Sequence, residues 1–81
     1  MIKNEARQRI KKMFPGYVLD YQGTEIRYNK KYITLKVYLD NGQGMGNFYI
    51  PDCDNCVDDL DVVLYIEHNF PKIYPELFTK E

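Results

Sequence analysis

The sequence contains no serine, no tryptophan, one histidine and only two cysteines. Without serine, and with His68 as the sole histidine, it offers little material for nucleophilic or acid–base catalysis. Two cysteines are too few for the disulfide framework of a small secreted domain. The longest apolar run, residues 62–66, is far shorter than a membrane span or a signal-peptide core. We therefore expect a non-enzymatic cytoplasmic protein that requires no cofactor and does not enter a membrane.

The N-terminal segment is basic and amphipathic. Its apolar residues recur at helical spacing and predict a helix over residues 3–14, which Pro15 and Gly16 end. We expect this to be a structural helix and not a targeting peptide, because it leads directly into the rest of the domain. The apolar stripe consists of Ile2, Ala6, Ile10, Met13 and Phe14.

The middle of the chain has the alternation that is typical of strands. Residues 32–39 place Ile33, Leu35, Val37 and Leu39 on one face, and residues 47–50 follow after the turn sequence Asp40-Asn41-Gly42. Residues 17–22 and 25–28, separated by Gly23, predict one or two further strands. The opposite, tyrosine-rich face of this sheet carries Tyr32, Thr34, Lys36, Tyr38 and Tyr49.

A second helix is predicted over residues 57–69, with Asn55 as its N-cap. On a helical wheel, one side carries Val57, Leu60, Val63 and Leu64, whereas Val62 and Ile66 emerge on the other side. We expect the second patch to be covered by the proline-containing C-terminal tail or by a dimer partner. The fold class is then α+β, one domain over residues 1–81. Its sheet has three to four antiparallel strands, with both helices on one face, in the order α-β-β-(β)-β-α.

Charge is segregated along the chain although the net charge is only −1. Residues 1–40 contain nine Lys and Arg against four Asp and Glu, and residues 41–81 contain two against eight. Folding can either interleave the two halves or leave a bipolar surface, and only a bipolar surface offers separate patches to partners.

Cys53 and Cys56 form a CxxC pair that suggests redox or metal chemistry. Neighbouring aspartates disfavour a thiolate, and His68 lies twelve residues beyond Cys56, too far along a helix to complete a zinc site. We expect two free thiols and no metal, although a disulfide or zinc bridge between two chains stays open. The aspartates do not fit a calcium loop, because Val63 stands where the bidentate glutamate belongs. The Gly42-x-Gly44-x-Gly46 motif is a flexible turn.

Capping of the second helix explains most of the aspartates, but together they also form a candidate acidic patch that docks on a basic protein, such as a nucleic-acid-binding protein. We expect a small regulator or inhibitor of the kind that phages or other mobile elements encode. The proposed patch consists of Asp52, Asp54, Asp58, Asp59, Asp61 and Glu67.

Two alternatives remain. The tyrosine-rich sheet face and the basic first helix could bind nucleic acid, because tyrosines stack on bases and lysines contact phosphates. Alternatively, Val62 and Ile66 could form the contact of a homodimeric structural subunit. The sequence leaves the oligomeric state open.

Overall fold

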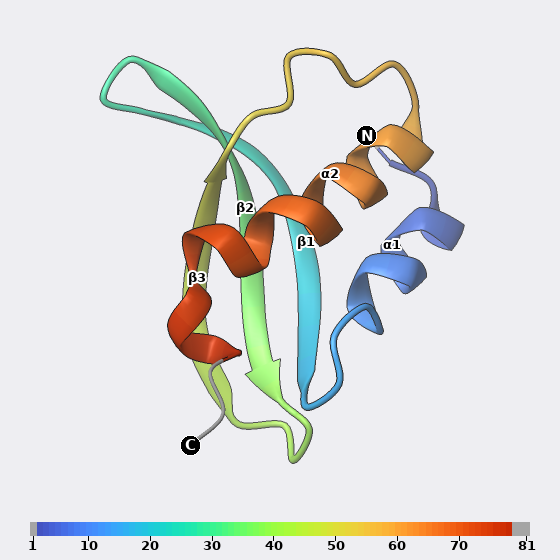
Figure 1. Ribbon diagram of the computed structural model, residues 1–81, viewed down its shortest axis with the longest axis vertical. Coiled ribbons are helices and arrows are strands. Elements are labelled where there is room, and N and C mark those ends of the chain that lie inside the picture. Colours follow the sequence, from blue (N-terminus) through green and yellow to red (C-terminus); the bar gives the residue numbers. More distant parts are fainter. Residues whose placement is uncertain (1, 79–81) are drawn as a thin grey trace.

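The strands of this chain form an antiparallel sheet in the order β1-β2-β3, and both helices lie on the same side of it (Figure 1). The computed structural model describes residues 2–78 of the chain. The predicted α+β class and the order of elements are confirmed, with three strands. The elements are α1 (Asn4–Lys11), β1 (Tyr17–Arg27), β2 (Lys30–Leu39), β3 (Gly44–Pro51), α2 (Asp59–Ile73) and the 3₁₀ turn η1 (Pro75–Leu77).

Strand β1 is continuous where the sequence suggested a break. Its pairing with β2 skips one residue between Tyr21 and Gly23, and Gly23 has a φ of 102°. A β-bulge of this kind absorbs an extra residue and increases the twist of the strand without ending it. The tight turn to β2 lies at Tyr28 and Asn29, both with positive φ.

Strand β2 confirms the predicted alternation. Ile33, Leu35 and Val37 are buried beneath the helices, together with Leu19 of β1 and Ile50 of β3. Ala6 and Ile10 of α1, and Ile2 just before it, join this core from the predicted stripe, and Met13 and Phe14, just after α1, pack at its margin. Burial of this apolar area is the main term that stabilises so small a fold.

Helix α2 begins two residues later than predicted and has a different cap. Asp58, not Asn55, is the N-cap, and its carboxylate accepts a hydrogen bond from the Asp61 amide at 3.0 Å. The helix also continues past Asn69, through Pro71, to Ile73.

The assignment of the two faces of α2 was wrong. Val63, Ile66 and Phe70 form the buried stripe, whereas Leu60 and Leu64 are 47% and 48% exposed. A wheel that stops at Asn69 omits Phe70, whose burial decides which side of the helix faces the sheet. Ile66 therefore needs no tail to cover it, because it lies in the core cluster with the sheet residues.

The segment after α2 does fold back, but over the C-terminal part of the helix. The Phe78 ring lies 5.8 Å from that of Phe70 and 5.0 Å from that of Phe14, centroid to centroid. The Tyr17 hydroxyl donates a hydrogen bond to the Leu77 carbonyl at 2.8 Å. These contacts join the segment after α2 to β1 and to the connection between α1 and β1.

Candidate functional site

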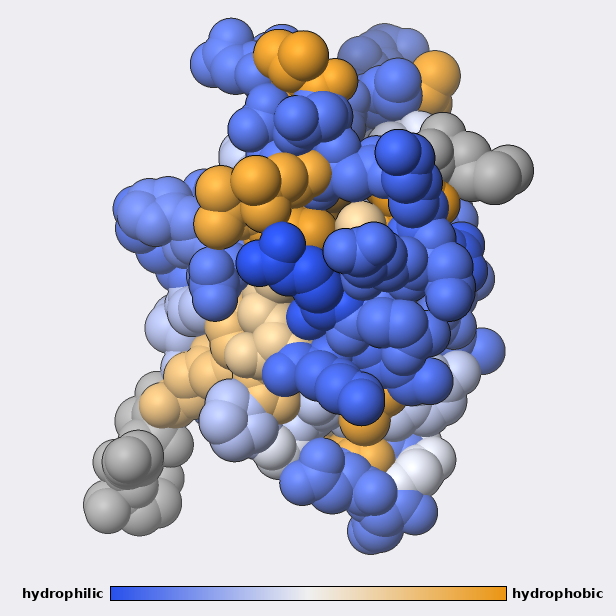
Figure 2. Space-filling model, turned by 90° about the vertical axis from the view of Figure 1, so that its right-hand side faces the viewer, coloured by the Kyte–Doolittle hydropathy of each residue, from blue (hydrophilic) through white to orange (hydrophobic). Residues whose placement is uncertain are grey.

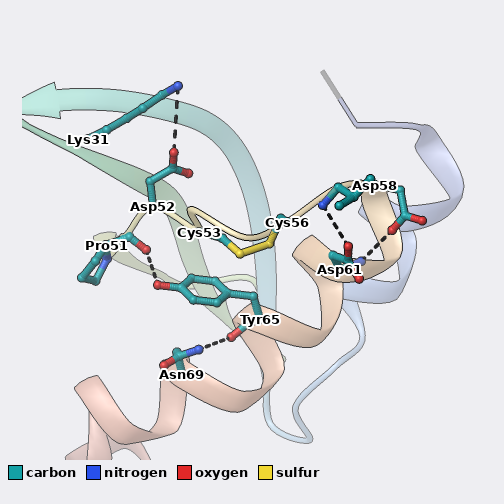
Figure 3. Close-up of a disulfide and its surroundings, with 10 residues drawn as sticks. Lys31, Pro51, Asp52, Cys53, Cys56, Asp58, Asp61, Tyr65 and Asn69 are labelled. Atoms are coloured by element: carbon teal, nitrogen blue, oxygen red, sulfur yellow. Dashed lines mark hydrogen bonds and ion pairs between the residues drawn. A yellow bond between two sulfur atoms is a disulfide. The ribbon is translucent and has the colours of Figure 1, made fainter.

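The proposed acidic patch lies on the loop after β3 and the first turns of α2. Two of its carboxylates, those of Asp58 and Asp61, accept hydrogen bonds from backbone amides at the start of α2, so the helix-capping explanation holds for these two (Figure 3). Asp58 caps α2, and Asp61 accepts from the Val57 amide at 2.8 Å. Asp59 accepts from the Lys3 amide at 2.8 Å and thereby links the start of α2 to the start of α1.

Within residues 2–78, one ion pair joins a basic residue of the first half of the chain to an acidic residue of the second. The Lys31 ammonium lies 3.9 Å from the Asp52 carboxylate. The surface is therefore not divided into two fully separate poles. Within residues 2–78, Asp54 and Glu67 make no hydrogen bond or ion pair, so their carboxylates are free to meet a partner.

Cys53 and Cys56 are joined by a disulfide, with 5.6 Å between their Cα atoms (Figure 3). The expectation of two free thiols is wrong, because the turn between them brings the two side chains within bonding distance. In the described part of the chain, no group of three or more His, Cys, Asp or Glu side chains could hold a metal ion.

Tyr65 lies next to this loop. Its hydroxyl donates a hydrogen bond to the Pro51 carbonyl at 2.6 Å, at the end of β3. Burial raises the pKa of the Tyr65 phenol, and the negative charges of Asp52 and Asp54 raise it further. Each of these effects disfavours the phenolate, so the hydroxyl keeps its proton as a hydrogen-bond donor.

The exposed side of α2 carries a hydrophobic strip that consists of Val57, Leu60 and Leu64. The helical wheel placed these residues on one side together with the buried Val63. Leu60 and Leu64 are one helical turn apart, and Val57, just before the helix, is 91% exposed. On the face of the molecule shown in Figure 2, hydrophobic residues gather in such a strip between hydrophilic surfaces.

A groove of about 220 Å³ runs beside this strip, between α1 and α2. Basic and acidic side chains stand at its rim, and small or apolar ones form its floor. Its lining residues are Lys3, Glu5, Ala6, Arg9, Asp59, Leu60 and Val63.

The predicted homodimer contact is not available as described. Ile66 has 0% exposure, and Val62 is partly buried against the core. The exposed large apolar residues of α2 are instead Leu60, Leu64 and, at its C-terminal end, Ile73.

The five residues of the predicted tyrosine-rich face do lie together. The register pairs Thr34 with Tyr49, and Tyr32, Lys36 and Tyr38 follow at alternate positions of β2, on the face opposite the core. No element described over residues 2–78 packs on this face (Figure 1). The Lys36 ammonium lies 5.9 Å from the centre of the Tyr38 ring.

Arg27 was missed as a member of this face. Its guanidinium lies 4.5 Å from the centre of the Tyr49 ring, donates a hydrogen bond to the Tyr49 hydroxyl at 2.8 Å, and pairs with Glu25 at 3.2 Å. No spacing in the sequence predicts this contact. Thr34, on the same face, is only 7% exposed, and its hydroxyl has no hydrogen-bond partner within residues 2–78.

No protein-family model, curated protein or solved structure matches the chain. None of the helices described over residues 2–78 is long and apolar enough to cross a membrane. The functional argument therefore depends on the surfaces described above.

Proposed function

We propose that this protein is a non-enzymatic binding module that docks on a protein partner through the exposed face of α2. The observation that carries the proposal is the pair Leu60 and Leu64, each about half exposed on a helix whose opposite side is fully buried. Removing the exposed half of each leucine from water would contribute about 1 kcal/mol per residue to an interface. Two such residues on one helix face are typical anchors for a helix or loop of a partner.

The charges around the leucines indicate a basic partner. Glu67 follows Leu64 by three residues and is exposed, and Asp54 is exposed on the loop before the helix. Carboxylates without an intramolecular partner can steer a basic surface toward the apolar strip at little desolvation cost. A basic nucleic-acid-binding protein fits this chemistry. The role as a phage-type regulator or inhibitor remains a prediction, and so does a cytoplasmic location. The disulfide counts against a cytoplasmic location, because stable disulfides are rare in the cytosol.

The groove between α1 and α2 gives the partner a place to insert a side chain. Its apolar floor, formed by Ala6 and Val63, suits an aliphatic or aromatic group, whereas its rim carries both signs of charge. We therefore expect the partner to present an apolar anchor to the groove, and basic residues beside it that face Glu67 and Asp54.

Capture of partners from extracts of the native host or its prey, with matched variants, tests the proposal. The wild type should retain a protein that is lost with Leu60→Ser/Leu64→Ser and weakened by Glu67→Lys. The control Lys36→Glu, on the opposite side of the molecule, should retain it. The proposal fails if retention is the same with and without the two leucines, provided that circular dichroism shows both variants folded.

The second candidate function is nucleic-acid binding by the uncovered sheet face. It is favoured by the cations on that face, since Arg27 lies against Tyr49 and Lys36 lies near Tyr38. Proteins that bind single-stranded nucleic acid stack the bases on aromatic rings and contact the phosphates with nearby cations. Recovery of nucleic acid alone, with a salt-dependent affinity that Lys36→Glu weakens and Glu67→Lys does not, would favour this function over protein docking.

A further inference from the structure

The loop between β3 and α2 is held by few interactions besides its disulfide. At its start, the Asp52 amide donates to the Lys31 carbonyl at 3.0 Å, and at its end the Val57 amide donates to Asp61. Between these points, residues 53–56 make no backbone hydrogen bond within the described chain. The Cys53–Cys56 bond is thus the main constraint on the segment that leads into the Asp58 cap (Figure 3).

Both cysteines are partly exposed, so a reductant in solution can reach the bond. Asp52 and Asp54 flank Cys53, and Asp58 follows two residues after Cys56. Exchange starts with attack of the reductant's thiolate on one of these partly exposed sulfurs.

We propose that Cys53–Cys56 is a reversible thiol–disulfide exchange site, opened by a dithiol reductant, that controls the start of α2. A thiolate of the reductant attacks one sulfur and forms a mixed disulfide, and its second thiolate then displaces that sulfur. The reductant leaves as its own disulfide, and the two cysteines gain two electrons and two protons. Opening the bond releases Val57 and the capping contacts of Asp58 and Asp61, next to Leu60. The consequence for docking rests on the proposed function, whereas the exchange site itself does not.

Amide hydrogen exchange in the oxidised and reduced protein tests the local effect. The folded protein is treated with dithiothreitol without denaturant, the thiols are blocked with iodoacetamide, and intact mass counts them. We expect both thiols to be labelled. The amides of Val57 and Asp61 should exchange about fivefold to tenfold faster, the factor expected when a capping interaction is lost. The Leu35 amide, in the central strand, should be unchanged.

The variant Cys53→Ser/Cys56→Ser separates loss of the bond from an effect of the reductant. It should show the fast exchange of the reduced protein and should not respond to dithiothreitol. Thiols that are labelled only after denaturation would overturn the proposal. Equal exchange at Val57 and Asp61 in the two states, or a variant that exchanges like the oxidised protein, would also overturn it.

Partner capture before and after reduction tests the link to docking. We expect severalfold weaker retention by the reduced protein. Faster exchange with unchanged capture would contradict the link and leave the exchange site standing. No captured protein in either state would instead count against the proposed function alone.

Discussion

The hydroxyl of Tyr74 both accepts a hydrogen bond from the Tyr49 amide, at 2.9 Å, and donates one to the Tyr49 carbonyl, at 2.8 Å. Tyr49 lies on β3, at the edge of the sheet, where its outward amide and carbonyl have no neighbouring strand. One side chain from the C-terminal segment thus supplies both bonds that a further strand would make. Unpaired edges invite pairing with other chains, so this contact also shields the edge of β3 at Tyr49.

Replacement of Tyr74 by phenylalanine should destabilise the fold by about 1–2 kcal/mol, because it leaves the Tyr49 amide and carbonyl without their partner. The ring, which packs 4.8 Å from Phe48, is kept in this variant. Urea unfolding measures the change. The matched control is Tyr38→Phe, whose hydroxyl makes no hydrogen bond within residues 2–78 and whose loss should cost almost nothing. Equal stability of the two variants would contradict the role of Tyr74.

Truncation on the two sides of α2 should have very different costs. Ile66→Ala removes a fully buried side chain and should lower the free energy of unfolding by about 2–5 kcal/mol. Leu64→Ala, on the exposed side, should cost less than about 1 kcal/mol. Chemical denaturation of both variants checks the assignment of faces, and a larger loss for Leu64→Ala would reverse it.

Stability should fall at alkaline pH in part because of Tyr65. Its pKa is raised in the folded protein by burial and by Asp52 and Asp54, so the unfolded chain releases the phenolic proton first, at about pH 10. The contribution of this group is fully present below that pH and is lost as the pH rises through the folded pKa. Tyr65→Phe should therefore show a shallower fall in unfolding free energy between about pH 9 and 11. An unchanged slope would show that Tyr65 does not titrate differently in the two states.

The sequence predicts the helices and strands of this fold better than it predicts which of their faces are buried. The alternation of Ile33, Leu35 and Val37 determines which face of β2 is buried, because strand periodicity needs no knowledge of neighbours. Helix α2 has apolar residues on both sides, so periodicity alone does not select its core face. The sheet selects it, through Val63, Ile66 and Phe70.

The candidate sites depend even more on contacts between distant residues. Nothing in the spacing of Asp59 indicates that its carboxylate accepts a bond from the Lys3 amide, 56 residues away. The stacking of Arg27 on Tyr49 likewise depends on how the three strands pair and how the sheet twists. The exposure of Leu60 and Leu64 can be predicted only once the packing of α2 on the sheet is known.

Photo-crosslinking from single positions tests the docking surface most directly. A photoreactive phenylalanine analogue replaces Leu64 in one variant and Tyr38 in another, and each is irradiated in extract of the native host or its prey. We predict a protein adduct from position 64 and none from position 38. An adduct from position 38 alone, whether with protein or nucleic acid, would contradict docking through α2.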